Sequence, residues 1–286
     1  MNISIRIDQV MRPVFSALGL TWMPTHPRGK GVFVRSLGHG GKTDDEVLAT
    51  LRRMGLRWVM LMGESFSGQA VSVPRQRYSE LVPRLRAAGI EPWLWGWIEP
   101  GTVDRFTLEV GGLARDLGIH GICIDVEGPW VTHRAKLPLP ELENRAEDCV
   151  AALRRHVAAV GFTSFPGGPQ FFGSKNFPWR GFARACDWGM PQLYGQDPQD
   201  VIPQSEQIPT ARQMVDWQRS WLELLDGRMI PVLGGLPNSA HLKITFDRAE
   251  LPLSACAWWD LAHLAPNKVD TIGSFVVHRR KGEAIA

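Results

Sequence analysis

Two carboxylates close a short apolar run near the middle of the chain. Residues 121–130 read GICIDVEGPW, so one residue separates Asp125 from Glu127. Side chains alternate faces along a β-strand, which predicts both acids on one face with Cα atoms roughly 6.5–7 Å apart. Two adjacent carboxyl groups resist joint ionisation, so one pKa rises and a proton donor lies beside an anion. Cleavage of a glycosidic bond requires that combination.

The other residues of this run predict the strand that positions the pair. Ile122, Ile124 and Val126 line the face opposite the acids, as in a parallel strand covered by helices. The same alternation of apolar run and helical period continues along the chain. Strands are predicted at 31–36, 57–62, 91–98, 121–126, 161–165, 187–194, 229–233 and 255–259. Helices are predicted at 43–54, 75–88, 104–117, 142–160, 181–184, 210–225, 240–250 and within 268–279.

This order of elements predicts an α/β fold, a single-domain (β/α)8 TIM barrel, rather than an open sheet. The barrel is expected to occupy residues 31–286, after an N-terminal extension of residues 1–30. In such barrels the active site forms where the strands end at their carboxyl side. The polar and aromatic residues at the predicted ends are Ser36, His39, Glu64, Trp97, Glu99, Asp125, Glu127, Gln192, Tyr194, Trp258, Trp259 and Asp260.

Composition narrows the class of protein. The 286 residues are 44% hydrophobic and 21% charged, as in a soluble protein with a large core. The net charge of +3 favours a polyanionic partner such as a bacterial wall and does not indicate nucleic acid. No CxxC or HExxH motif occurs, so we predict buried thiols, no metal and no cofactor. Polar residues interrupt any signal-peptide core, and no apolar run is long enough for a membrane span. We therefore expect no membrane partner and synthesis in the cytoplasm, with release to the cell wall as one possible route.

The functional interpretation assigns the acids unequal roles. Glu127 would protonate the leaving oxygen, and Asp125 would orient a reacting group or stabilise positive charge on the sugar. Acids on one strand do not easily lie on opposite faces of a sugar ring. Either the acetamido group of the substrate attacks, or a third acid, Glu64 or Glu99, takes part. The structural alternative is that Glu127 caps the next loop while Asp125 pairs with Arg35.

Three short segments resemble known glycosidase motifs. GICIDVEG resembles the fourth-strand D-x-E motif of family 25 lysozymes, and more loosely that of family 18 chitinases. The segment MPQLY, 190–194, resembles a chitinase motif whose Met, polar residue and Tyr face the sugar, and AWWD, 257–260, resembles the eighth-strand tryptophan segment of the same clan. The chain departs from both families: the first strand lacks the early aspartate of family 25, and His120 and Cys123 replace the first two aspartates of the longer chitinase signature.

The resemblance implies roles for individual residues. Glu127 would be the general acid and Asp125 the partner that holds the acetamido group. Tyr194 would hydrogen-bond that group or the developing charge, although a rim aromatic that caps the barrel is the alternative. Gln192 would bind a sugar hydroxyl.

The twelve tryptophans suit a sugar cleft, because apolar sugar faces stack on indoles. Trp97 and one of Trp258 and Trp259 are the main candidates for substrate binding, with Trp130 as a further one. His39, in a predicted loop, is a further candidate for substrate contact.

The sequence thus predicts a glycoside hydrolase of N-acetylated polysaccharide, with peptidoglycan first, as in a lysozyme- or endolysin-like muramidase or glucosaminidase. One alternative is a non-catalytic sugar-binding barrel. The other is a metal-dependent barrel hydrolase that uses Glu64, Glu99, Asp125 and Glu127 as ligands.

Overall fold

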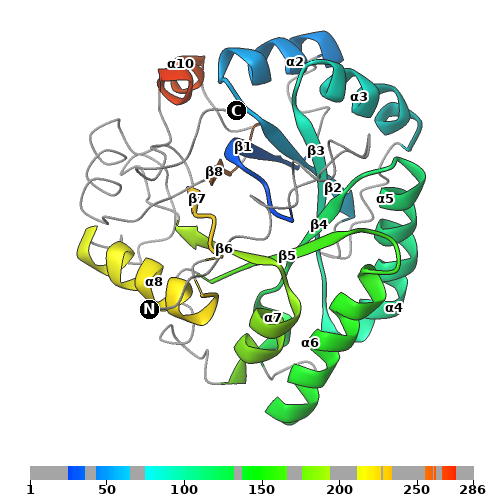
Figure 1. Cartoon of the computed structure of the whole chain (residues 1–286), viewed down its shortest axis with the longest axis vertical. Helices are drawn as coiled ribbons and strands as arrows, with labels where there is room; N and C mark the ends of the chain where they lie inside the picture. The colour runs from blue at the N-terminus through cyan, green and yellow to red at the C-terminus, as the bar shows by residue number, and fades with distance from the viewer. Residues whose placement is uncertain are drawn as a thin grey trace, which may run out of the picture.

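The computed structural model describes residues 25–35, 43–64, 75–131, 137–165, 176–193, 211–226, 228–233, 255–259, 261 and 266–274. Its parallel strands β1 to β8 follow one another in chain order and close into a barrel. The helices lie around the outside of this barrel (Figure 1). The predicted (β/α)8 architecture is therefore confirmed.

The strands are β1 (Gly29–Val34), β2 (Trp58–Glu64), β3 (Glu91–Trp97), β4 (Gly121–Asp125), β5 (Ala159–Ser164), β6 (Trp188–Leu193), β7 (Val232–Leu233) and β8 (Ala255–Trp258). The α-helices are α2 (Asp44–Arg53), α3 (Arg75–Ala87), α4 (Val103–Phe106), α5 (Gly112–Asp116), α6 (Leu139–Leu153), α7 (Trp179–Ala185), α8 (Ala211–Leu224) and α10 (Pro266–Ser274). A π-helical turn, η3 (Thr107–Gly111), joins α4 to α5, and the 3-10 turns are η2 (Pro100–Thr102) and η4 (Gly128–Trp130). None of the helices in the described ranges is long and apolar enough to cross a bilayer.

Several predicted boundaries were wrong. Helix α6 ends at Leu153 and β5 begins at Ala159, whereas the helix was predicted to continue to residue 160. The apolar residues Val157 and Val160 extend the helical period into the strand, and no glycine or proline marks the break. Strand β1 begins at Gly29, two residues before the predicted start, and β7 is shorter than predicted. The predicted helix 240–250 lies outside the described residues.

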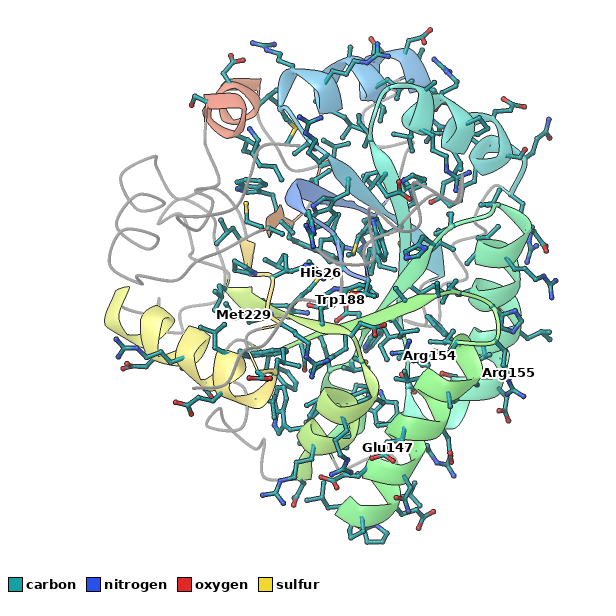
Figure 2. All side chains as sticks on the ribbon, in the orientation of Figure 1. His26, Glu147, Arg154, Arg155, Trp188 and Met229 are labelled. Carbon is teal, nitrogen blue, oxygen red and sulfur yellow. The ribbon has the colours of Figure 1, made fainter. Side chains whose placement is uncertain are left out.

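Side chains fill the barrel interior in a large-against-small pattern. Trp58 lies over Gly31, Trp93 over Gly121 and Trp188 over Gly161, each pair on neighbouring strands. A Cβ atom at any of these glycines would lie 2.1–2.2 Å from the indole. Only glycine therefore leaves room for these indoles near the N-terminal ends of the strands. Figure 2 shows Trp188 inside the barrel, while Glu147 and Arg155 project from the helical layer.

Alternation along the strands separates two hydrophobic cores. The interior core contains Phe33, Met60, Trp95, Cys123 and Met190 among others. The core between strands and helices contains the other face of the same strands, including Ile122, Ile124 and Phe162. The predicted outward face of β4 is thus confirmed, and its inward face leads from Cys123 to Asp125 at the carboxyl end of the strand.

Candidate active site

Asp125 is the last residue of β4 and lies at the mouth of the barrel. Its Cα is in register with that of Trp97 on β3 and that of Thr163 on β5. The side chain of Asp125 is only 7% exposed, because the neighbouring strands enclose it. A carboxyl group this buried requires hydrogen-bond partners.

Glu127 follows the end of β4 and is more exposed than Asp125. Gln192, from the carboxyl end of β6, connects the two acids. Its amide nitrogen donates to Oε1 of Glu127 at 2.7 Å and to Oδ1 of Asp125 at 3.1 Å. Both acids and Gln192 therefore form one hydrogen-bonded group. The sequence placed all three at strand ends, and such ends meet at one rim of a barrel.

The environment favours the neutral form of Asp125. Burial raises the pKa of this carboxyl well above its usual range, and the charge of Glu127 and a hydrogen bond with Glu127 raise it further. The hydrogen bond from Gln192 opposes this rise in the pKa. Of the two acids, Asp125 is therefore the one whose carboxyl holds a proton more strongly than usual.

The structural alternative for the two acids does not match these contacts. The side chain of Glu127 makes no capping hydrogen bond to η4, and its oxygen instead accepts from Gln192. Asp125 is buried with Gln192 and Glu127 as partners, whereas Arg35 is exposed.

Trp97 lies beside the pair at the end of β3. Its indole is half-buried, and within the described part of the chain its Nε1 has no hydrogen-bond partner. This nitrogen is itself shielded from solvent, so the exposed part of the indole ring is what a substrate could contact. This position agrees with the predicted substrate contact, which stays a prediction.

The two adjacent tryptophans at the carboxyl end of β8 differ in burial. Trp259 is partly exposed and packs on the interior core, with ring centroids 5.0 Å from Trp95 and 5.4 Å from Phe33. Trp258 is 0% exposed and belongs to the core between strands and helices. Of the two, Trp259 is therefore the one that can face a sugar.

Trp130 is also placed differently from the prediction of a substrate contact. It is completely buried between strands and helices, where it packs on Phe182 and donates to the carbonyl oxygen of Ile98 at 2.8 Å. The loop after β4 folds back as η4 and carries this indole into the core. Its position five residues beyond the end of β4 did not reveal that turn.

Of the remaining candidates, two lie within the described residues, at or just beyond the ends of β2 and β3. Glu99 is partly buried beyond the end of β3, where its backbone hydrogen-bonds with Thr102. Glu64 closes β2. His39 and Tyr194 lie outside the described residues. Among the described side chains, no group of three or more His, Cys, Asp or Glu residues could hold a metal ion.

Cys123 was not singled out as functional from the sequence, and Met190 was expected to face the sugar only through the resemblance of its segment to a chitinase motif, whereas its side chain is buried. Cys123 and Met190 lie in the interior core one layer below Asp125 and Gln192, with Sγ and Sδ 3.7 Å apart. Their positions two residues before Asp125 and Gln192 were a usable signal, since residues i and i+2 of a strand share a face.

Comparison with known proteins supports the fold. No family model and no curated protein sequence matches the chain. Its structural neighbours include the spore cortex-lytic enzyme SleL of Bacillus megaterium QM B1551, with a TM-score of 0.59 and 12% identity over 98% of this chain and 86% of that one. A GH18 chitinase from Pseudoalteromonas aurantia has a TM-score of 0.60 and 12% identity, covering 85% of this chain and 97% of that one. An endo-beta-N-acetylglucosaminidase from Cordyceps militaris has a TM-score of 0.54 and 12% identity, covering 95% of each chain.

These neighbours share the barrel with this chain. Of the two families that the motifs resemble, family 18 is the one that the neighbours support, and the resemblance to family 25 lysozymes finds no support.

Proposed function

We propose that this protein is a glycoside hydrolase that cleaves an N-acetylated polysaccharide, with Glu127 as the general acid. The observation that carries the proposal is the hydrogen-bonded group of Asp125, Glu127 and Gln192 at the carboxyl ends of β4 and β6. The structural neighbours support it, since they include a cortex-lytic enzyme, a chitinase and an endo-beta-N-acetylglucosaminidase.

The roles follow from exposure and charge. Glu127 is the more exposed acid, so it is the one that reaches the glycosidic oxygen. The pair holds one proton, because burial and mutual repulsion oppose its complete ionisation. This proton passes through Glu127 to the leaving oxygen as the glycosidic bond breaks. Asp125 is then ionised beside the positive charge that develops on the sugar, and it stabilises that charge or holds the acetamido group.

The close contact between the two acids limits which group can act as the nucleophile. Hydrolysis by two separate carboxylates places them on opposite sides of the scissile bond, about 5 Å or more apart. Here Asp125 and Glu127 hydrogen-bond with one another and share Gln192, so no sugar ring fits between them. This contact favours attack by the acetamido oxygen of the substrate, which is the reason to propose an N-acetylated glycan. Water then opens the cyclic intermediate, returns a proton to the pair and leaves the product with retained configuration.

Among such glycans we place peptidoglycan first. A net charge of +3 suits a polyanionic wall, and one structural neighbour is a spore cortex-lytic enzyme. Trp97 and Trp259 are the proposed sugar-contacting indoles. The role of Tyr194 in holding the acetamido group remains part of the proposal.

The test is clearing of purified peptidoglycan and cleavage of chitin oligomers by the wild type and the Glu127→Gln variant. Loss of a general acid lowers the rate by about 100- to 10,000-fold, so Glu127→Gln is expected to lose nearly all activity. Glu109→Gln, the same change at an exposed helical position, serves as the control and should remain active. The proposal fails if the wild type cleaves neither substrate, or if Glu127→Gln keeps most of the activity.

A further inference from the structure

The layer below the acid pair consists of two sulfur atoms. Cys123 precedes Asp125 by two residues on β4, and Met190 precedes Gln192 by two residues on β6, so each lies directly deeper on the same inward face. Both side chains are 0% exposed. The thiol of Cys123 donates to Sδ of Met190 at 3.7 Å, so the two sulfur atoms contact each other across the barrel interior.

The strands beside Asp125 add no charge at this level. On β3 its neighbour in register is Trp97, and on β5 it is Thr163, whose hydroxyl donates to the carbonyl oxygen of Met190 at 2.8 Å. From β6 come the neutral side chains of Met190 and Gln192. In the described part of the chain, the titratable groups that interact with Asp125 are Glu127 and Cys123. Burial and the nearby Asp125 raise the pKa of the Cys123 thiol well above its usual range, so the thiol stays neutral.

We propose that Cys123 and Met190 act together as positioning residues, an uncharged sulfur floor that keeps the Asp125 carboxyl turned toward Glu127 and keeps a proton on the pair. The physical reason is that thiol and thioether are weak hydrogen-bonding groups. An ionised Asp125 gains little from turning down to them, whereas Glu127 and Gln192 offer strong partners above. The consequence for catalysis rests on the proposed function, but the effect on protonation does not.

The floor therefore sets the pH at which the pair loses its proton. A hydroxyl at position 123 is a stronger donor than a thiol and would stabilise the ionised carboxyl. Cys123→Ser is thus expected to lower the pKa of Asp125. It should also move the alkaline limb of the pH–rate profile to lower pH, since activity needs the singly protonated pair.

The matched control is Cys149→Ser. Cys149 is equally buried, but it lies on α6 in the core between strands and helices. Both variants replace a buried sulfur atom with oxygen, but the one at position 149 lies away from the acids. Protonation of Asp125 is followed in the full chain by carboxyl carbon-13 titration, with its signal assigned through Asp125→Asn. The pH–rate profile is the second readout.

The proposal is supported if the titration midpoint of Asp125 falls in Cys123→Ser by more than it falls in Cys149→Ser. It is overturned if the midpoint in Cys123→Ser matches that of the wild type. If circular dichroism shows that Cys123→Ser is unfolded, Met190→Gln replaces it, because this variant also places a strong donor in the floor, and the same criteria apply. If the wild type cleaves no glycan, the proposed function fails, while the carboxyl titration still decides whether the floor controls the pair.

Discussion

The side-chain amide of Gln192 reaches across from β6 to lie 2.7 Å from Oε1 of Glu127. The same nitrogen donates to Asp125 on β4. A neutral donor shared by two acids fixes their geometry without adding charge, so it aligns the pair while leaving its proton in place. This use of the amide nitrogen leaves the amide oxygen of Gln192 as the atom that could accept from a sugar hydroxyl.

Removal of this amide should misalign the acids and move their titration. The hydrogen bond from Gln192 lowers the pKa of Asp125, so Gln192→Leu is expected to raise that pKa further and shift the alkaline limb of activity to higher pH. Loss of a hydrogen bond to a charged group costs about 1.5–3 kcal/mol, which predicts a clear fall in kcat. The pH–rate profile checks both effects. Gln76→Leu, at an exposed position of α3, is the control; a Gln192→Leu profile that matches it contradicts the assigned role.

Asp125 should also make the stability of the protein depend on pH. Its pKa is raised in the folded state, so its contribution to stability is complete below the pKa of the unfolded chain and is lost as pH rises through the folded-state pKa. Asp125→Asn mimics the protonated acid and does not titrate. The Tm of the variant is therefore expected to gain on that of the wild type as pH increases. Thermal melts across a pH series measure this difference, and a constant difference would contradict the burial of an ionisable pair.

The glycine–tryptophan pairs in the interior should be intolerant of a single methyl group. In Gly161→Ala, the new Cβ would lie 2.1 Å from the indole of Trp188. Overpacking of this kind destabilises a protein by about 1–3 kcal/mol, occasionally more. Gly112→Ala, in α5, meets no atom within 4 Å and should be neutral or stabilising by up to about 1 kcal/mol. Denaturant unfolding of both variants compares them directly, and equal stability would show that the indole moves freely.

The adjacent tryptophans of β8 should differ in what their removal changes. Trp258→Ala empties a fully buried site and is expected to cost about 3–5 kcal/mol of stability. Trp259→Ala removes a partly exposed indole at the barrel mouth, so it should raise KM for the glycan with a smaller loss of stability. Unfolding curves and kinetics on the same two proteins test this contrast. It is contradicted if Trp258→Ala affects KM more than Trp259→Ala does.

Local patterns were sufficient for the barrel and for the centre of its site. The recurrence of short apolar runs and helical periods predicted the closed parallel barrel, because each element depends on hydrophobic periodicity within its own segment. Asp125 and Glu127 were expected on one face of β4, and Gln192 at the same rim, because strand alternation and the direction of parallel strands are fixed by backbone geometry.

Tertiary structure decided what depends on contacts between distant segments. The sequence predicted that one of the two acids would have a raised pKa. Burial between β3 and β5 makes Asp125 that acid. The sequence offered one of Trp258 and Trp259 as a main candidate and Trp130 as a further one, while packing buried Trp130 and Trp258 and left Trp259 partly exposed. The segment GICIDVEG, residues 121–128, predicted by its local period that the two acids lie close together at the end of one strand. The contacts of Gln192 with both acids and of Cys123 with Met190 depend on the curvature of the barrel, which brings β6 to β4 across the strand between them.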